Sequence, residues 1–169
     1  EENKRLMREL ERYISSAAVS EALQRKGVQS IEATILFSDM RGFTAASFDH
    51  DTADVFNAIN MTMSFQAEIV KKWGGYVDGF SGDGMLAVFD CEEAPLRACK
   101  AAREIIERAR VTEVPIWNPL PIGIGINSGT VIRGDLGSET RRAHTVIGST
   151  VNVSARLCGV AKGLEAVAS

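Results

Sequence analysis

The chain has 169 residues, of which 45% are apolar and 24% are charged, as is ordinary for one globular domain with its own core. Its formal net charge of −3 argues against an electrostatic nucleic-acid binder, so no nucleic-acid partner is expected. No apolar run approaches the ~20 residues that cross a bilayer, and no signal peptide opens the sequence. The cysteines form no CxxC pair, which is typical of thiols in a reducing compartment. We therefore expect a cytoplasmic domain, whether or not the full-length protein is attached to a membrane.

Residues 1–27 have the pattern of a charged helix, with Leu6, Leu10, Tyr13 and Ala17 along one side. One interpretation is a surface helix packed on the domain. The other, which we favour, is the end of a parallel coiled coil that links an upstream regulatory domain to residues 28–169. The sequence begins in this helix without a starting Met, so we expect it to be an excised fragment.

The remaining sequence alternates strand and helix patterns. An apolar strand is expected at 31–38, and a helix from the N-cap signal at 51–54 to the glycine pair at 74–75. The later expectations are strands at 76–80 and 85–89 around a hairpin turn, a helix from Pro95, strands at 120–127 and 130–132, a polar loop at 134–142, a strand at 144–147 and a helix at 150–160.

This order, β-α-β-β-α-β with additions, predicts an α+β fold of the ferredoxin-like, split-βαβ type. Such a fold has an antiparallel sheet with helices on one face. The final residues, 165–169, have the pattern of a further strand.

Two aspartates are the strongest candidates for a functional site. Asp39 follows the first strand and Asp83 lies in the hairpin turn, where each alone would be an ordinary turn residue. In a split-βαβ sheet these two positions are neighbours at one edge. Two carboxylates held there suit a pair of divalent cations that grip a nucleoside triphosphate.

Asn152 and Arg156 form a second candidate cluster. They are four residues apart on a predicted helix, so they share one face. That face is either a solvated polar surface or a site where the amide orients a sugar and the guanidinium stabilises phosphoryl charge.

With these motifs in order, the chain resembles the class III nucleotidyl cyclases, the family of adenylate and guanylate cyclases. The motif Phe-Ser-Asp-Met-Arg-Gly-Phe-Thr at 37–44 and three segments at 74–84, 123–129 and 145–157 carry the resemblance. It implies a homodimer that converts a nucleoside triphosphate into a cyclic 3′,5′-nucleotide and pyrophosphate, as part of signal transduction.

The resemblance also implies roles for single residues. Asp39, Asp83 and the Met40 carbonyl would hold two Mg²⁺ or Mn²⁺ ions per site. Asn152 and Arg156 would come from the partner protomer as catalytic residues. The phosphates would be bound by backbone amides around Gly42, Phe43 and Thr44, and by an arginine of the 141–142 pair, with Arg142 the one we select.

Two positions depart from the family pattern. Gly79 and Ser149 stand where adenylate-forming members usually carry the Lys and Asp that read the base. Gly79 offers the base no side-chain hydrogen bond and Ser149 can donate to or accept from either base, so we expect weak base selectivity. The frequency of ATP use in the family, and no residue of this sequence, slightly favours ATP over GTP. The alternative is a cyclase-like module retained for dimerisation or nucleotide sensing without catalysis.

The family also continues past the Asn/Arg helix into two more strands, one with a phosphate-binding Lys. Lys162 does not match that Lys, and we expect these C-terminal strands to be missing. Polymerase palms and diguanylate-forming domains also use two acids on this sheet, but they lack the Asn/Arg helix.

Overall fold

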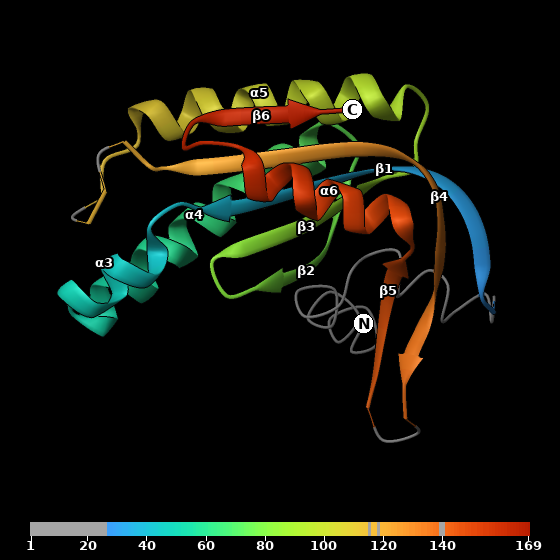
Figure 1. The fold of residues 1–169 in the computed structure, drawn as a ribbon, viewed down its shortest axis with the longest axis horizontal. Coiled ribbons are helices and arrows are strands. Elements are labelled where there is room, and N and C mark those ends of the chain that lie inside the picture. Colours follow the sequence, from blue (N-terminus) through green and yellow to red (C-terminus); the bar gives the residue numbers. More distant parts are fainter. Residues whose placement is uncertain (1–26, 115, 118, 139–140) are drawn as a thin grey trace, which may run out of the picture.

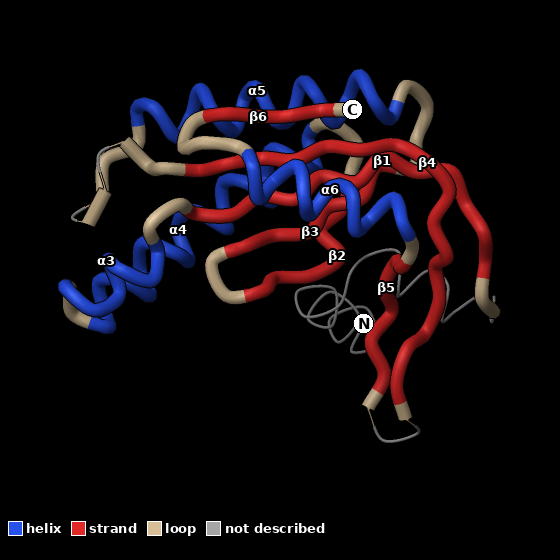
Figure 2. Tube along the Cα trace, viewed as in Figure 1, coloured by secondary structure: helices blue, strands red, loops and turns tan. Residues whose placement is uncertain are grey.

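The computed structural model describes residues 27–114, 116–117, 119–138 and 141–169. The predicted helix at 1–27 lies almost entirely outside the described residues. Helices flank one six-stranded sheet (Figures 1 and 2). In chain order they are β1 (Gln29–Met40), α3 (Phe43–Asp49), α4 (Thr52–Lys72), β2 (Tyr76–Ser81), β3 (Gly84–Phe89), α5 (Ala94–Val111), β4 (Ile122–Gly137), β5 (Arg142–Ile147), α6 (Ser149–Val160) and β6 (Glu165–Ala168).

The strand order β2-β3-β1-β4 is that of a split-βαβ unit, and each neighbouring pair is antiparallel. The α+β, ferredoxin-like prediction is therefore confirmed. Two strands extend this unit along the free edge of β4: β5 pairs antiparallel with its second half and β6 pairs parallel with its first half. The pattern at 165–169 does form a strand, as expected.

The strand β4 is longer than the sequence indicates. Two separate strands followed by a loop from residue 134 were expected, and this was wrong: β4 continues from Ile122 to Gly137 and bends along its length (Figure 1). The glycines that suggested breaks are paired, Gly129 with Ala33 of β1 and Gly134 with Thr145 of β5. Backbone pairing on β4 therefore outweighs the weak strand preference of glycine.

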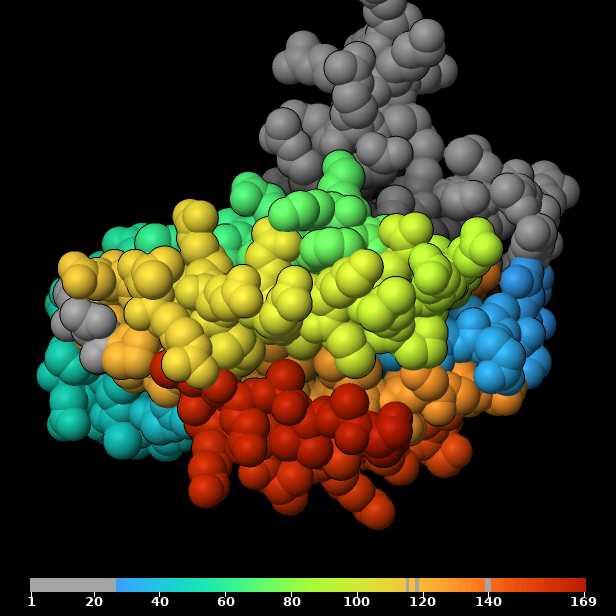
Figure 3. All heavy atoms as spheres, turned by 90° about the horizontal axis from the view of Figure 1, so that it is seen from above, coloured from blue at the N-terminus to red at the C-terminus, as the bar shows by residue number. Residues whose placement is uncertain are grey.

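Helices α4 and α5 cover one face of the sheet, as predicted. Alternate strand residues point toward them and form the main core, among them Leu36 of β1 and Ile122, Ile124 and Ile126 of β4. The intervening residues, such as Ile35, point to the other face and form a smaller cluster with Val131 and Val146. Figure 3 shows α5, in yellow-green and yellow, beside the red C-terminal segment.

Helix α6, which follows the split-βαβ unit, packs on the opposite face from α4 and α5. A Cβ at Gly125 would lie 2.1 Å from the Cys158 backbone nitrogen, so α6 rests directly on β4 where no side chain intervenes. The prediction that the helices lie on one face of the sheet is therefore correct for the split-βαβ unit and wrong for α6. No helix among the described residues is long and apolar enough to cross a bilayer.

Candidate active site

Asp39 lies at the end of β1, next to the hairpin between β2 and β3. Its Oδ1 accepts a hydrogen bond from the Met40 backbone nitrogen at 3.0 Å. A Cβ at Gly84, the first residue of β3, would lie 3.1 Å from the Ser38 carbonyl and 3.8 Å from Asp39 Oδ1. The absence of a side chain at Gly84 lets the hairpin approach the carboxylate closely.

Asp83 lies in that hairpin turn and interacts with Asp39. Partial burial raises the pKa of Asp83 to about 6, and the adjacent Asp39 carboxyl adds to the rise through a hydrogen bond and its negative charge. The structure therefore brings the two predicted acids together at one edge of the sheet. Two carboxylates in this arrangement repel each other unless a proton or a cation lies between them.

The donors at this edge fit hard divalent cations. Asp39 and Asp83 supply carboxylate oxygens, and the Met40 carbonyl belongs to the residue next to Asp39. In the described part of the chain no group of three His, Cys, Asp or Glu side chains comes together to hold a metal, so a ligand set here would rely on backbone, water or substrate oxygens. Mg²⁺ ions that bind phosphates typically take one or two carboxylates from the protein and fill their other positions with such oxygens.

The predicted phosphate-binding residues follow directly. Gly42 adopts a left-handed conformation with φ 73° and precedes α3, which begins at Phe43. Nothing lies within 4 Å of a Cβ at Gly42, and Thr44 is exposed, so the backbone here is open to a ligand. Phe43 is half-buried and packs near Trp117, which anchors this short helix beside the core.

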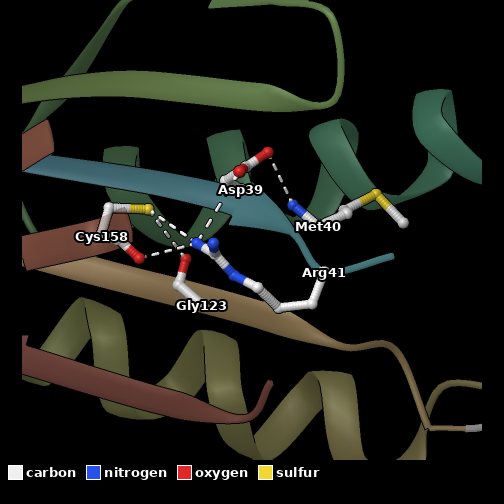
Figure 4. Close-up of polar contacts among 5 residues, drawn as sticks. All are labelled: Asp39, Met40, Arg41, Gly123 and Cys158. Atoms are coloured by element: carbon white, nitrogen blue, oxygen red, sulfur yellow. Dashed lines mark hydrogen bonds and ion pairs between the residues drawn. The ribbon is translucent and has the colours of Figure 1, made fainter. Parts of the chain in front are cut away.

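Arg41 is a member of the site that the sequence analysis did not single out (Figure 4). Its Nη2 lies 3.7 Å from Asp39 Oδ2 and donates to the Cys158 carbonyl at 2.7 Å. The guanidinium occupies space that Gly123 leaves open on β4. The glycines inside an apolar strand were the available signal, because they mark places where something approaches the backbone.

A cleft of about 650 Å³ extends from Asp39 toward β5 and α6. Its lining comes from β1, β2, β3, β5 and α6 and includes Gly79, and nothing lies within 4 Å of a Cβ at that glycine. Thr145 of β5 donates to Asp78 Oδ2 at 2.6 Å, which ties β5 to β2 across this cleft. Burial is the main reason that the pKa of Asp78 is raised.

Asn152 and Arg156 do not join the two acids within one chain. Both are exposed on α6, and neither lines the cleft that contains Asp39. Ser149, the first residue of α6, is also exposed. These three side chains of α6 are therefore accessible to solvent in the single chain.

Arg142 is exposed at the start of β5. It pairs with Gly137, 14 residues along β4 from Gly123, the residue that pairs with Asp39. At ~3.3 Å per residue this is about 45 Å along the strand. Because β4 bends, β5 nevertheless returns toward the acids, and Ala143, the residue after Arg142, lines the same cleft as Asp39. The Arg142 Nε donates to the Ser138 carbonyl at 3.4 Å.

Comparisons with known proteins agree on one family. A family model described as the adenylate and guanylate cyclase catalytic domain matches residues 26–167. An adenylate cyclase of Anabaena cylindrica is 29% identical over 94% of this chain and 34% of its own length. The crystal structure of the guanylyl cyclase Cya2 superposes with a TM-score of 0.79 at 32% identity, over 85% of this chain and 77% of that one.

A dimeric guanylyl cyclase domain from the fungus Blastocladiella emersonii is also similar. Its TM-score is 0.75 at 30% identity, over 85% of this chain and 82% of that chain. The present chain spans about a third of the Anabaena relative and 6% of a matching Dictyostelium discoideum adenylate cyclase.

Proposed function

Because the chain belongs to the family of adenylate and guanylate cyclase catalytic domains, we propose that it converts ATP, in preference to GTP, into the cyclic 3′,5′-monophosphate and pyrophosphate. The observation that carries this proposal is the Asp39–Asp83 pair at one sheet edge, with the pKa of Asp83 raised to about 6. A site that holds two carboxylates in repulsion gains most when cations bind between them.

Asp39, Asp83 and the Met40 carbonyl are proposed to hold two Mg²⁺ or Mn²⁺ ions. When bound, these ions lower the pKa of the ribose 3′-hydroxyl and neutralise the triphosphate. The chain's own residues then position the reactants. The backbone at Gly42, Phe43 and Thr44, open in the structure, binds phosphate oxygens and holds the α-phosphorus in line with the hydroxyl.

The rest of the site is proposed to come from a second copy of the chain. Asn152 orients the ribose and Arg156 stabilises the charge that develops on the phosphoryl group. Their exposure on α6, outside the cleft that contains Asp39, supports this division between subunits. Arg142, exposed at the start of β5, is proposed to contact the triphosphate.

The proposed preference for ATP rests on the adenylate cyclase relative and not on a base-reading side chain. Gly79 faces open space in the cleft and Ser149 carries a hydroxyl that can donate or accept, so neither favours one purine strongly. The missing polar partner removes about 1–3 kcal/mol of discrimination. Control by an upstream domain through residues 1–27, where the sequence predicts a helix, belongs to the same proposal.

The test is turnover by the purified chain with Mn²⁺ and either ATP or GTP, with cyclic product separated by chromatography. We expect product from both nucleotides and more from ATP. Asp39→Ala and Asp83→Ala should abolish turnover without unfolding the domain, whereas Asp54→Ala, on the exposed first turn of α4, should not. A confirmed dimer that forms no product would refute the proposal, and tight binding without turnover would favour the non-catalytic module.

A further inference from the structure

The Arg41 side chain connects three parts of the molecule that are far apart in sequence (Figure 4). It leaves the end of β1 and lies over β4. Its Nη2 contacts α6 through the Cys158 carbonyl at 2.7 Å and the Cys158 sulfur at 3.3 Å. The same nitrogen lies 3.7 Å from the Asp39 carboxylate.

The contact with α6 is at a favourable place on that helix. Cys158 is in the last turn of α6, where backbone carbonyls lack helical donors and carry a partial negative charge. The Ala161 backbone nitrogen also donates to this carbonyl, at 3.2 Å. A guanidinium at 2.7 Å therefore satisfies the carbonyl and complements the charge of the helix end.

The position of Arg41 depends on Gly123. A Cβ at Gly123 would lie 2.7 Å from Arg41 Nε and 2.8 Å from Nη2, which is too close for both to keep their places. Because the crowded atoms are the far end of a flexible side chain, a methyl group there would move the guanidinium and leave the backbone in place. The absence of a side chain at Gly123 therefore leaves the space that the Arg41 guanidinium occupies.

We propose that Arg41 is a positioning residue that fixes α6, and with it Asn152 and Arg156, relative to the Asp39 carboxylate. This inference rests on the proposed function. In the proposed dimer each subunit gives Asp39 to one site and α6 to the other. Arg41 therefore sets the geometry between the two half-sites of a subunit, and a shift of about 1 Å in a catalytic group can cost about a hundredfold in rate.

The first test is the split between kcat and KM. Arg41→Ala should lower kcat by about tenfold or more and change the KM for the metal-bound nucleotide by less than about threefold, because Asn152 and Arg156 act in the transition state. Arg41→Lys should recover part of the loss, since an ammonium can still donate to the Cys158 carbonyl. Arg103→Ala, an exposed arginine on α5, is the matched control and should leave kcat unchanged.

A second test, Gly123→Ala, should displace the Arg41 guanidinium without removing its positive charge. In the wild-type background it should lower kcat about as much as Arg41→Ala does. In the Arg41→Ala background it should have little further effect, because the atoms it displaces are gone. Additive losses in this cycle would overturn the proposal, as would an Arg41→Ala enzyme with normal kcat.

The third readout needs no turnover. With Cys91 and Cys99 replaced by serine, Cys158 is the sole thiol of the chain and is buried. Its labelling by a thiol reagent should be slow and should accelerate by about tenfold or more after Arg41→Ala or Gly123→Ala. Unchanged labelling in both variants would overturn the proposed role of Arg41 in holding α6. If the wild-type chain shows no turnover, the proposed function is wrong. If the wild type is active and the variants keep its kcat, only the positioning role of Arg41 is wrong.

Discussion

Asp83→Asn should stabilise the metal-free protein at neutral pH. In the folded chain the pKa of Asp83 is raised from 3.8 to about 6, first by burial and then by the Asp39 carboxyl. The folded state therefore binds more protons than the unfolded chain between about pH 4 and pH 6. Stability falls as pH rises through that window and stays low above it.

The size of this effect follows from the shift. About two pKa units at 1.36 kcal/mol each give a ceiling of about 3 kcal/mol. Because the carboxylate is partly exposed and solvent screens it, we expect about 1 kcal/mol. For a chain of this size that corresponds to a gain of about 2–4 °C in Tm.

The assay is thermal unfolding of wild type and Asp83→Asn with a chelator present, from pH 4.5 to pH 8. The two curves should lie close together at the acid end, separate as the pH rises to 6 and stay apart above it, with the variant more stable. Added Mn²⁺ should raise the Tm of the wild type more than that of the variant. Glu92→Gln, a change to an exposed carboxylate before α5, should show no such pH dependence. Parallel curves for wild type and Asp83→Asn would refute the repulsion on which the metal site is argued.

Three further predictions concern selectivity, packing and pH. Gly79→Lys combined with Ser149→Asp should raise the ratio of kcat/KM for ATP to kcat/KM for GTP by about tenfold. A Cβ at Gly79 meets open space, so the new side chain fits, and the two new polar groups can hydrogen-bond to adenine. An unchanged ratio would mean that the base binds elsewhere. Gly125→Ala should cost more than about 2 kcal/mol of unfolding free energy in urea, since its Cβ would lie 2.1 Å from the Cys158 nitrogen. Gly159→Ala, with nothing within 4 Å, should instead add up to about 1 kcal/mol, and a loss at both sites would contradict the close contact of α6 with β4. Mn²⁺ affinity, measured by titration, should fall about tenfold per pH unit below pH 6 as a proton competes for Asp83, and a flat profile would contradict the raised pKa.

The arrangement of the acidic pair could be expected from the sequence because it depends on the order of elements. Once strand, helix and hairpin are placed, split-βαβ pairing puts the end of β1 beside the β2–β3 turn, and the structure brings Asp39 and Asp83 together there. Local patterns sufficed for these elements because each has strong turn or cap signals. Asp51, for example, caps α4 by accepting from the Ala53 nitrogen at 2.8 Å.

Other features depend on contacts between distant segments. Gly129 and Gly134 resemble breaks in the sequence, but pairing with β1 and β5 keeps β4 continuous. The position of α6 against the sheet depends on a backbone approach at Gly125 that periodicity does not reveal. The role of Arg41 could not be predicted from the sequence because its partners, Gly123 and Cys158, lie more than eighty residues later in the chain.

Mixing two inactive variants tests the shared-site proposal most directly. Asp39→Ala removes a metal ligand and Arg156→Ala removes a guanidinium that the account assigns to the opposite subunit. Each protein alone should be inactive. After subunit exchange, half of the dimers are mixed and each has one intact site, so activity should return to about a quarter of wild type. Verified mixed dimers that remain inactive would contradict a site built from two subunits.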